Sequence, residues 1–165
     1  MEAPTGRASK RLGPLIGALM ALALASPAVA QTCARPDDEV ALQVRVLQTN
    51  LMVGALSCQQ HDPYNAFVAR FQPTLAVHGK ALKAYFKRAH GGGWNTVLDE
   101  FVTRLANEAS LRGMQNLSTF CTESKRLFHA VMAADATAGL EGFVATWSRR
   151  GEHGVLPCVQ QAAIP

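Results

Sequence analysis

Apolar residues recur at helical spacing in the segment that follows residue 35. Six of them, three or four residues apart as on one face of an α-helix, are Val40, Val44, Leu47, Leu51, Ala55 and Cys58. Asp37 or Asp38 can cap this helix, and their negative charge suits its positive end. Residues 51–56 are almost entirely apolar, which is typical of a helix that its neighbours cover on all sides. We therefore predict that a helix over residues 40–58 is the core of the fold.

A second helical stretch begins at Asp62-Pro63, a capping residue followed by proline at the first helical position. Its stripe at helical spacing comprises Tyr64, Phe67, Phe71, Leu75, His78, Leu82, Tyr85 and Ala89. Pro73 lies inside the stretch, but the stripe keeps its phase across the proline, so we expect a kink or a helix in two pieces. Three glycines, residues 91–93, end it.

Three shorter helical segments follow. Asn95 is expected to cap a helix that ends at Gly113, with a solvated face of alternating charge made of Glu100, Arg104, Glu108 and Arg112. Apolar spacing predicts a fourth helix over residues 117–132. A fifth is expected to start near Thr137 and end at Gly151, with Leu140, Phe143, Val144 and Trp147 facing inward. The predicted fold class is all-α, a bundle of four to five helices.

The first thirty residues have a different pattern. Three basic residues, Arg7, Lys10 and Arg11, precede an apolar run over residues 15–25, and small residues at Ala28 and Ala30 match a signal peptidase site. A membrane span would need about 20 apolar residues. We predict that residues 1–30 are a cleaved signal peptide and that residues 31–165 form a single helical domain. The alanine-rich leader is typical of bacteria, so we expect a periplasmic location.

The charge and hydropathy of the mature chain say little about its partners. The leader carries Arg7, Lys10, Arg11 and Glu2, so 13 of the 16 basic and 11 of the 12 acidic residues remain, a net charge of +2. A net charge this small favours no particular class of partner. No second apolar run is long enough to cross a bilayer, so we expect no transmembrane span in the mature chain.

The four cysteines are far apart in sequence and even in number, which predicts two disulfides in an oxidising compartment. A helix of about 20 residues is roughly 30 Å long, whereas bridged Cα atoms lie about 5–6 Å apart, so Cys33 and Cys58 at its two ends do not pair. In an up-down bundle, the end of the first helix and the start of the fourth share a pole, which favours Cys58 with Cys121 and Cys33 with Cys158. Pairing 33–121 with 58–158 stays open as the alternative.

Reactive and metal-binding signatures are missing from the sequence. The five histidines, His61, His78, His90, His129 and His153, include no pair three or four residues apart, and there is no H-E-x-x-H, G-x-S-x-G, C-x-x-C or P-loop motif. His61 and His90 both lie near helix ends and could meet in space. His78 lies on the apolar stripe of the second helical stretch. It is either a metal ligand or a pH-sensitive group. More commonly, such a residue is a core histidine with one hydrogen-bond partner. We expect no catalytic residues, no metal and no cofactor.

One basic cluster, at the end of the second helical stretch, is the best local signal. Its residues are Lys80, Lys83, Lys87 and Arg88. Such a cluster is either an anion contact, for phospholipid headgroups, a cell-wall polymer or an acidic protein surface, or a solvated helix end that the helix dipole favours. We expect no nucleic-acid partner, because the protein is predicted to work outside the cytoplasm.

By exclusion, the sequence favours a non-enzymatic periplasmic protein that binds another protein in the cell envelope, as an accessory subunit of an envelope assembly. Two alternatives stay open. The first is a small-ligand or lipid binder with a pocket lined by Phe67, Phe71, Phe101, Phe120, Phe128 and Phe143. The second is an envelope stress chaperone that exposes apolar surface when His78 is protonated.

Overall fold

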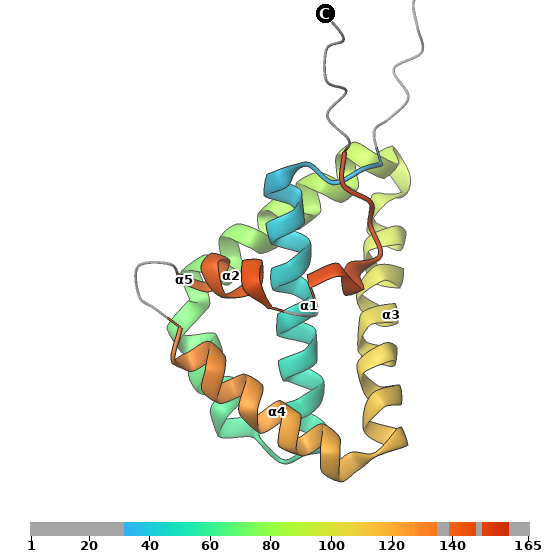
Figure 1. Cartoon of the computed structure of the whole chain (residues 1–165). Helices are drawn as coiled ribbons and strands as arrows, with labels where there is room; N and C mark the ends of the chain where they lie inside the picture. The colour runs from blue at the N-terminus through green and yellow to red at the C-terminus, as the bar shows by residue number, and fades with distance from the viewer. Residues whose placement is uncertain (1–31, 135–138, 148–149, 159–165) are drawn as a thin grey trace, which may run out of the picture.

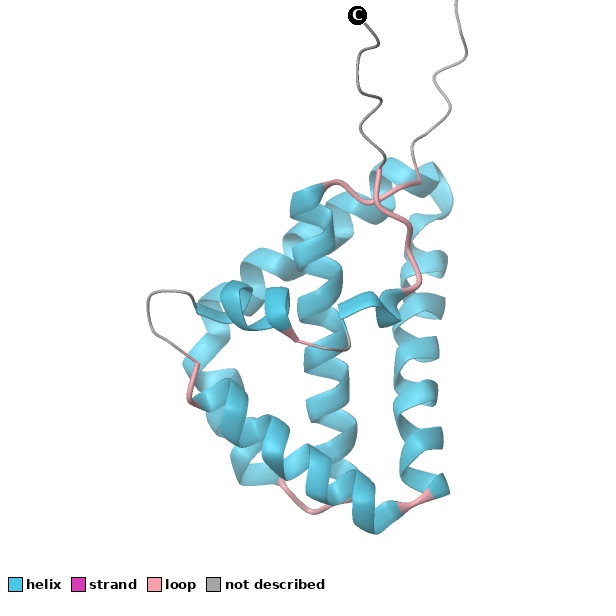
Figure 2. Cartoon of the chain, in the orientation of Figure 1, coloured by secondary structure: helices cyan, strands magenta, loops and turns pink. Residues whose placement is uncertain are grey.

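The computed structural model describes residues 32–134, 139–147 and 150–158, so the predicted signal peptide lies outside the described residues. These residues form five α-helices and two short 3-10 helices, with no strand among them (Figure 2). The α-helices are α1 (Pro36–Ser57), α2 (His61–His90), α3 (Trp94–Gln115), α4 (Leu117–Met132) and α5 (Gly139–Thr146), and the 3-10 helices are η1 (Gly91–Gly93) and η2 (Arg150–His153). The all-α helical bundle predicted from the periodicity is confirmed.

Helix α1 is the centre of the molecule, and the other four α-helices all pack against it (Figure 1). Its inward positions include Leu42, Val46, Leu47 and Leu51, which are fully buried. The prediction that this helix is the core is therefore confirmed. Its apolar end is not covered on all sides, however, because 65% of Leu56 is exposed.

Helix α2 continues without interruption through Pro73, so of the two expected forms, a kink and a helix in two pieces, the two-piece form is wrong. Its path bends between its lower and upper halves (Figure 1). It also begins earlier than expected, because His61 is its first residue and Gln60 its cap. Pro63 then takes the third helical position, where the backbone N–H has no helical partner and proline is tolerated. Asp62 lies in the first turn and is not the cap.

Several other helix ends differ from the prediction. Arg35 occupies the cap position of α1, and its backbone N–H donates to Asp38 Oδ2 at 2.8 Å, so neither Asp37 nor Asp38 is the cap. Gly93 occupies the cap position of α3, so Asn95 does not cap that helix. The α5 helix ends at Thr146 rather than at Gly151, and its expected start, Thr137, lies outside the described residues.

Gly113 does not end α3, which continues to Gln115. A Cβ atom at position 113 would lie 3.3 Å from the Phe120 ring, so this glycine allows α3 and α4 to approach each other closely. The helix ends where Asn116 caps α4, accepting a hydrogen bond from the Thr119 backbone N–H at 3.0 Å. Close packing, rather than helix termination, therefore explains the glycine.

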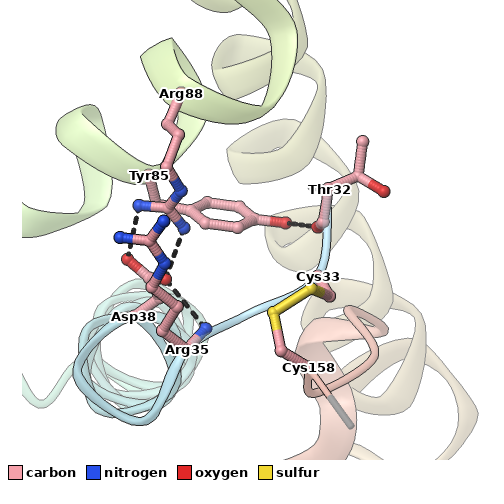
Figure 3. Close-up of a disulfide and its surroundings, with 7 residues drawn as sticks. All are labelled: Thr32, Cys33, Arg35, Asp38, Tyr85, Arg88 and Cys158. Carbon is pink, nitrogen blue, oxygen red and sulfur yellow. Dashed lines mark hydrogen bonds and ion pairs between the residues drawn. A yellow bond between two sulfur atoms is a disulfide. The ribbon is translucent and has the colours of Figure 1, made fainter. Parts of the chain in front are cut away.

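Two disulfides fasten opposite ends of the bundle. Cys58 pairs with Cys121 and Cys33 with Cys158, with Cα–Cα distances of 5.4 and 4.8 Å, as the argument from shared poles predicts. Beside the second bridge the chain ends form one parallel β-bridge, in which the Ala34 N–H donates to the Leu156 carbonyl at 2.9 Å. The two ends of the described domain are thus tied together at one pole (Figure 3).

Candidate functional sites

The five histidines lie at separate places in the described structure. Within the described ranges, no group of three or more His, Cys, Asp or Glu side chains could hold a metal ion. His61 and His90 are the first and last residues of α2, so about 44 Å of helix separates them and they do not meet. Both are exposed, as is His129.

His78 is half-buried and has an acidic partner. Its Nε2 lies 2.9 Å from Glu141 Oε1, a contact that joins α2 to α5. Partial burial raises the pKa of the Glu141 carboxyl, but hydrogen bonds from His78 and from the Glu141 backbone outweigh this effect and hold the pKa below its ordinary value. The geometry matches a structural histidine with one hydrogen-bond partner.

His153 is the histidine that sequence reasoning missed, because nothing in its spacing sets it apart. It is buried, and its Nδ1 accepts a hydrogen bond from the Val155 backbone N–H at 3.1 Å. Its Nε2 must then carry the proton, which it donates to Glu39 Oε1 at 2.9 Å. Because both ring nitrogens of His153 are hydrogen-bonded inside the protein, neither is available for acid–base chemistry. The contact between His153 and Glu39 holds the C-terminal segment against α1.

Arg104 reinforces the same contact from α3. Its Nη2 donates to the His153 carbonyl at 2.8 Å, while its Nη1 pairs with Glu108 at 3.0 Å. On α1, Gln43 donates to the Glu39 carboxylate at 3.1 Å. Side chains from three parts of the chain therefore fix the segment that leads to the terminal disulfide.

The predicted basic cluster is divided in the structure. Arg88 turns inward and pairs with the buried Asp38, with Nη2 2.5 Å from Oδ2 and Nη1 3.3 Å from Oδ1 (Figure 3). The Lys87 ammonium lies 4.8 Å from the centre of the Trp94 ring. Lys80 and Lys83 are exposed. Arg88 thus joins the end of α2 to the first turn of α1, and the three lysines remain on the surface.

Tyr85 lies beside this ion pair and ties down the start of the domain. Its hydroxyl donates to the Thr32 carbonyl at 2.6 Å (Figure 3). Burial raises the pKa of the Tyr85 hydroxyl, the charge of Asp38 raises it further, and Arg88 acts in the opposite direction. The result is a tyrosine whose neutral form is favoured.

The phenylalanines expected to line one ligand pocket belong to three separate clusters. Phe101 packs between α2 and α3, and Phe120 packs with Val53 and Ala109. The others share a cluster with Val44, Leu47, Leu51 and Ala55 of α1: Phe67, Phe71, Phe128 and Phe143. Hollows of about 600 and 810 Å³ open on the surface, but each is bordered by only some of these rings. This arrangement favours core filling over a shared internal pocket.

Two ranges that contain no charged residue lie at one pole of the bundle, where the Arg112 guanidinium donates a hydrogen bond to the Asn50 side chain. We use the term neutral pole for residues 46–61 and 113–122, which contain no Asp, Glu, Lys or Arg. They form the lower half of α1 with the turn after it and the corner between α3 and α4, which meet at the bottom of Figure 1. Large apolar side chains that are more than half exposed at this pole or within one turn of it are Leu56, Leu111, Met114 and Leu117.

The neutral pole is held together from several directions. The Cys58–Cys121 disulfide joins the end of α1 to α4. Between them, the Gln60 side chain accepts a hydrogen bond from Ser124 Oγ at 3.2 Å and donates to the Cys121 carbonyl at 3.4 Å. Sequence reasoning assigned Leu56 to the core because its neighbours are apolar, and it did not single out Met114 or Leu117.

Comparison with known proteins gives no relative: no family model, no curated protein and no solved structure matches this chain. Among the helices of the described residues, none has the length and apolar character needed to cross a membrane. The two disulfides are consistent with an oxidising compartment outside the cytoplasm.

Proposed function

We propose that this chain is a non-enzymatic periplasmic protein that binds another protein, as an accessory subunit of an assembly in the cell envelope. The observation that carries the proposal is the neutral pole, where Leu56, Met114 and Leu117 are each more than half exposed. The central part of a protein–protein interface is depleted in charged residues and enriched in methionine and aromatic side chains.

A binding role accounts for the chemistry of the histidines better than an enzymatic one. His153 uses both ring nitrogens inside the protein, and His78 is held by Glu141. A histidine that acts as a general base needs a ring nitrogen within hydrogen-bond reach of a substrate, which His153 does not offer. The cysteines of both disulfides offer no thiolate as a nucleophile.

The periplasmic part of the proposal is supported by the leader pattern over residues 1–30 and by the disulfides. Each bridge closes a long loop, with sequence separations of 125 and 63 residues. In the chain-entropy account, loops of that size contribute about 4–5 kcal/mol each, an upper range for native bridges. A domain that depends on such bridges belongs in an oxidising compartment.

The test is gentle isolation of the tagged protein from its own cell envelope, followed by size-exclusion chromatography under non-denaturing conditions. We expect it to elute with a second polypeptide in constant ratio. Elution as a bare monomer from every extract would contradict the proposal. Co-elution with a bound small molecule instead would support the ligand-binding alternative.

A further inference from the structure

Arg45 of α1 is a half-buried cation without a counter-charge. Arg88 and Arg112 are also half-buried, but each pairs with a carboxylate. No carboxylate in the described ranges lies within ion-pair distance of Arg45, and its enclosed Nε has no hydrogen-bond partner. Burial lowers the pKa of the Arg45 guanidinium below the ordinary 12.5, although Tyr64 acts in the opposite direction. Burying an unpaired charge costs stability, so the fold alone does not account for this arginine.

Gly79 of α2 is a second residue that internal packing does not explain. Glycine in a helix interior is less stable than alanine, so it usually serves a particular contact. Gly54 and Gly113 each allow two helices to approach, because a Cβ atom there would lie within 3.3 Å of a facing side chain. A Cβ atom at Gly79 would meet nothing within 4 Å. The missing side chain of Gly79 therefore leaves a space open that the described protein does not fill.

Arg45 and Gly79 line the same hollow between α1 and α2, together with Gln48 and His78, and its lining includes no Asp or Glu. Its volume is about 10 Å³, close to what a single water oxygen requires. We infer that Arg45 and Gln48 bind a small oxyanion here, a phosphate or carboxylate group that places one oxygen in the hollow and leaves the rest of the ligand in solvent. This binding does not depend on the proposed protein partner.

Arg45 and Gln48 have the chemistry that an oxyanion requires. They are three residues apart on α1, so their side chains share one face of the helix. A guanidinium matches the geometry of phosphate and carboxylate groups, and charge-assisted hydrogen bonds to such groups are stronger than neutral ones. Gln48 is half-buried, and its side-chain amide makes no hydrogen bond with another residue in the described ranges, so its N–H groups are available to a ligand.

The charges around the hollow also favour an anion. Residues 40–98, which include both of its walls, contain six Lys or Arg residues and one acidic residue, Asp62. Asp62 precedes His78 by 16 residues in α2, which is about 24 Å along the helix. Glu141 of α5 comes nearer, but its carboxylate is held by His78 Nε2 at 2.9 Å and it does not line the hollow. A surface with this excess of positive charge attracts anions.

The test is calorimetric titration of the protein, purified from its own cells, with inorganic phosphate and separately with acetate, at a constant ionic strength set by chloride. We expect one equivalent of at least one of these oxyanions to bind with a Kd of about 1 mM or tighter. Arg45→Gln should weaken this binding about tenfold or more, because it removes a charge-assisted hydrogen bond. The matched control, Lys83→Gln, removes an exposed cation of α2 outside the hollow and should change the Kd by less than about twofold.

Thermal unfolding checks that the loss of binding is not a loss of structure. Without phosphate or acetate, Arg45→Gln should melt at no lower temperature than the wild type, because no ion pair is removed. The oxyanion that binds should raise the melting temperature of the wild type and leave that of Arg45→Gln unchanged. Gly79→Leu should also lose binding, because its side chain would extend from the wall of the hollow although no charge is removed.

Vesicles distinguish the two sources of a phosphate group. Sedimentation with phosphatidylglycerol vesicles that Arg45→Gln abolishes would place the oxyanion on a lipid, whereas binding of free phosphate without vesicle binding would place it on a soluble molecule. Titrations of the wild type that do not saturate, binding that survives Arg45→Gln or Gly79→Leu, or equal losses from Arg45→Gln and Lys83→Gln would each overturn the inference.

Discussion

Gly54 of α1 lies so close to Ser124 of α4 that a Cβ atom at position 54 would fall 2.1 Å from the Ser124 hydroxyl oxygen. Real Cβ contacts are never this short, so only glycine permits the two helices to approach as they do. The same hydroxyl donates to the Gln60 side chain, which links the close approach to the turn that precedes α2. This contact sets the spacing of α1 and α4 just above the Cys58–Cys121 bridge.

Replacing this glycine should destabilise the protein. Gly54→Ala should lower the free energy of unfolding by about 1–3 kcal/mol, because overpacking a tight contact costs that much. The matched control is Gly79→Ala in α2, where a Cβ atom meets nothing within 4 Å. That variant should gain up to about 1 kcal/mol from the better helix propensity of alanine. Urea unfolding measures both, and equal effects of the two substitutions would refute the close approach.

The ion pair between Arg88 and Asp38 should be structural and not part of a surface contact. Arg88→Met leaves the buried Asp38 carboxylate without its cation, and we expect a loss of about 2 kcal/mol in unfolding free energy. Lys83→Met removes an exposed lysine five residues earlier in α2 and should change stability by less than about 0.5 kcal/mol. Thermal and urea unfolding of the two variants decide between the two roles, and indistinguishable midpoints would show that Arg88 is also a solvated residue.

Alkaline titration should reveal the environment of Tyr85. Its folded-state pKa is raised above the ordinary 10.0, so its contribution to stability is complete below pH 10 and is lost as the pH rises through the folded-state pKa. In a Tyr64→Phe background, absorbance at the tyrosinate band then follows Tyr85 alone. We expect an apparent pKa above 10 in the folded protein and a lower one in denaturant, and coincident curves would contradict the burial of this hydroxyl.

Acid should weaken the contact between α2 and α5. The folded-state pKa of Glu141 is held below the ordinary 4.5, so its contribution to stability is present above pH 4.5 and is lost as the pH falls through the folded-state pKa. The difference in unfolding free energy between the wild type and Glu141→Gln should therefore shrink as the pH falls below 4.5. His78→Gln should reduce this acid dependence. A difference that stays constant down to pH 3 would argue against the hydrogen bond with His78.

The helices and the disulfides could be predicted because each depends on a local or topological rule. Apolar spacing alone identified α1 to α4, since burying one face requires that period. The length of a helix compared with the short reach of a disulfide excluded a bridge between Cys33 and Cys58. The shared pole of the first and fourth helices then favoured the observed pairing, with 33–121 and 58–158 still open as the alternative. Helix ends were less predictable, because Gly113 serves a close approach to Phe120 and not helix termination.

The residues of the candidate sites were harder to predict, since their roles depend on contacts between distant parts of the chain. Arg88 and Asp38 are 50 positions apart, and nothing near Arg88 in the sequence distinguishes it from the neighbouring lysines. His153 meets Glu39 across 114 positions. Leu56 has the same apolar neighbours as the core residues before it, and only the packing of the other helices shows that it is exposed.

The most direct test of the central claim is native mass spectrometry of the mature protein, isolated gently from its own cell envelope, in three forms. The wild type should carry the extra mass of another polypeptide. Met114→Glu, at the neutral pole, should lose that mass, whereas Val77→Glu, at another apolar position that is more than half exposed, should retain it. A bare wild-type monomer, or a complex that Met114→Glu leaves intact, would contradict the account.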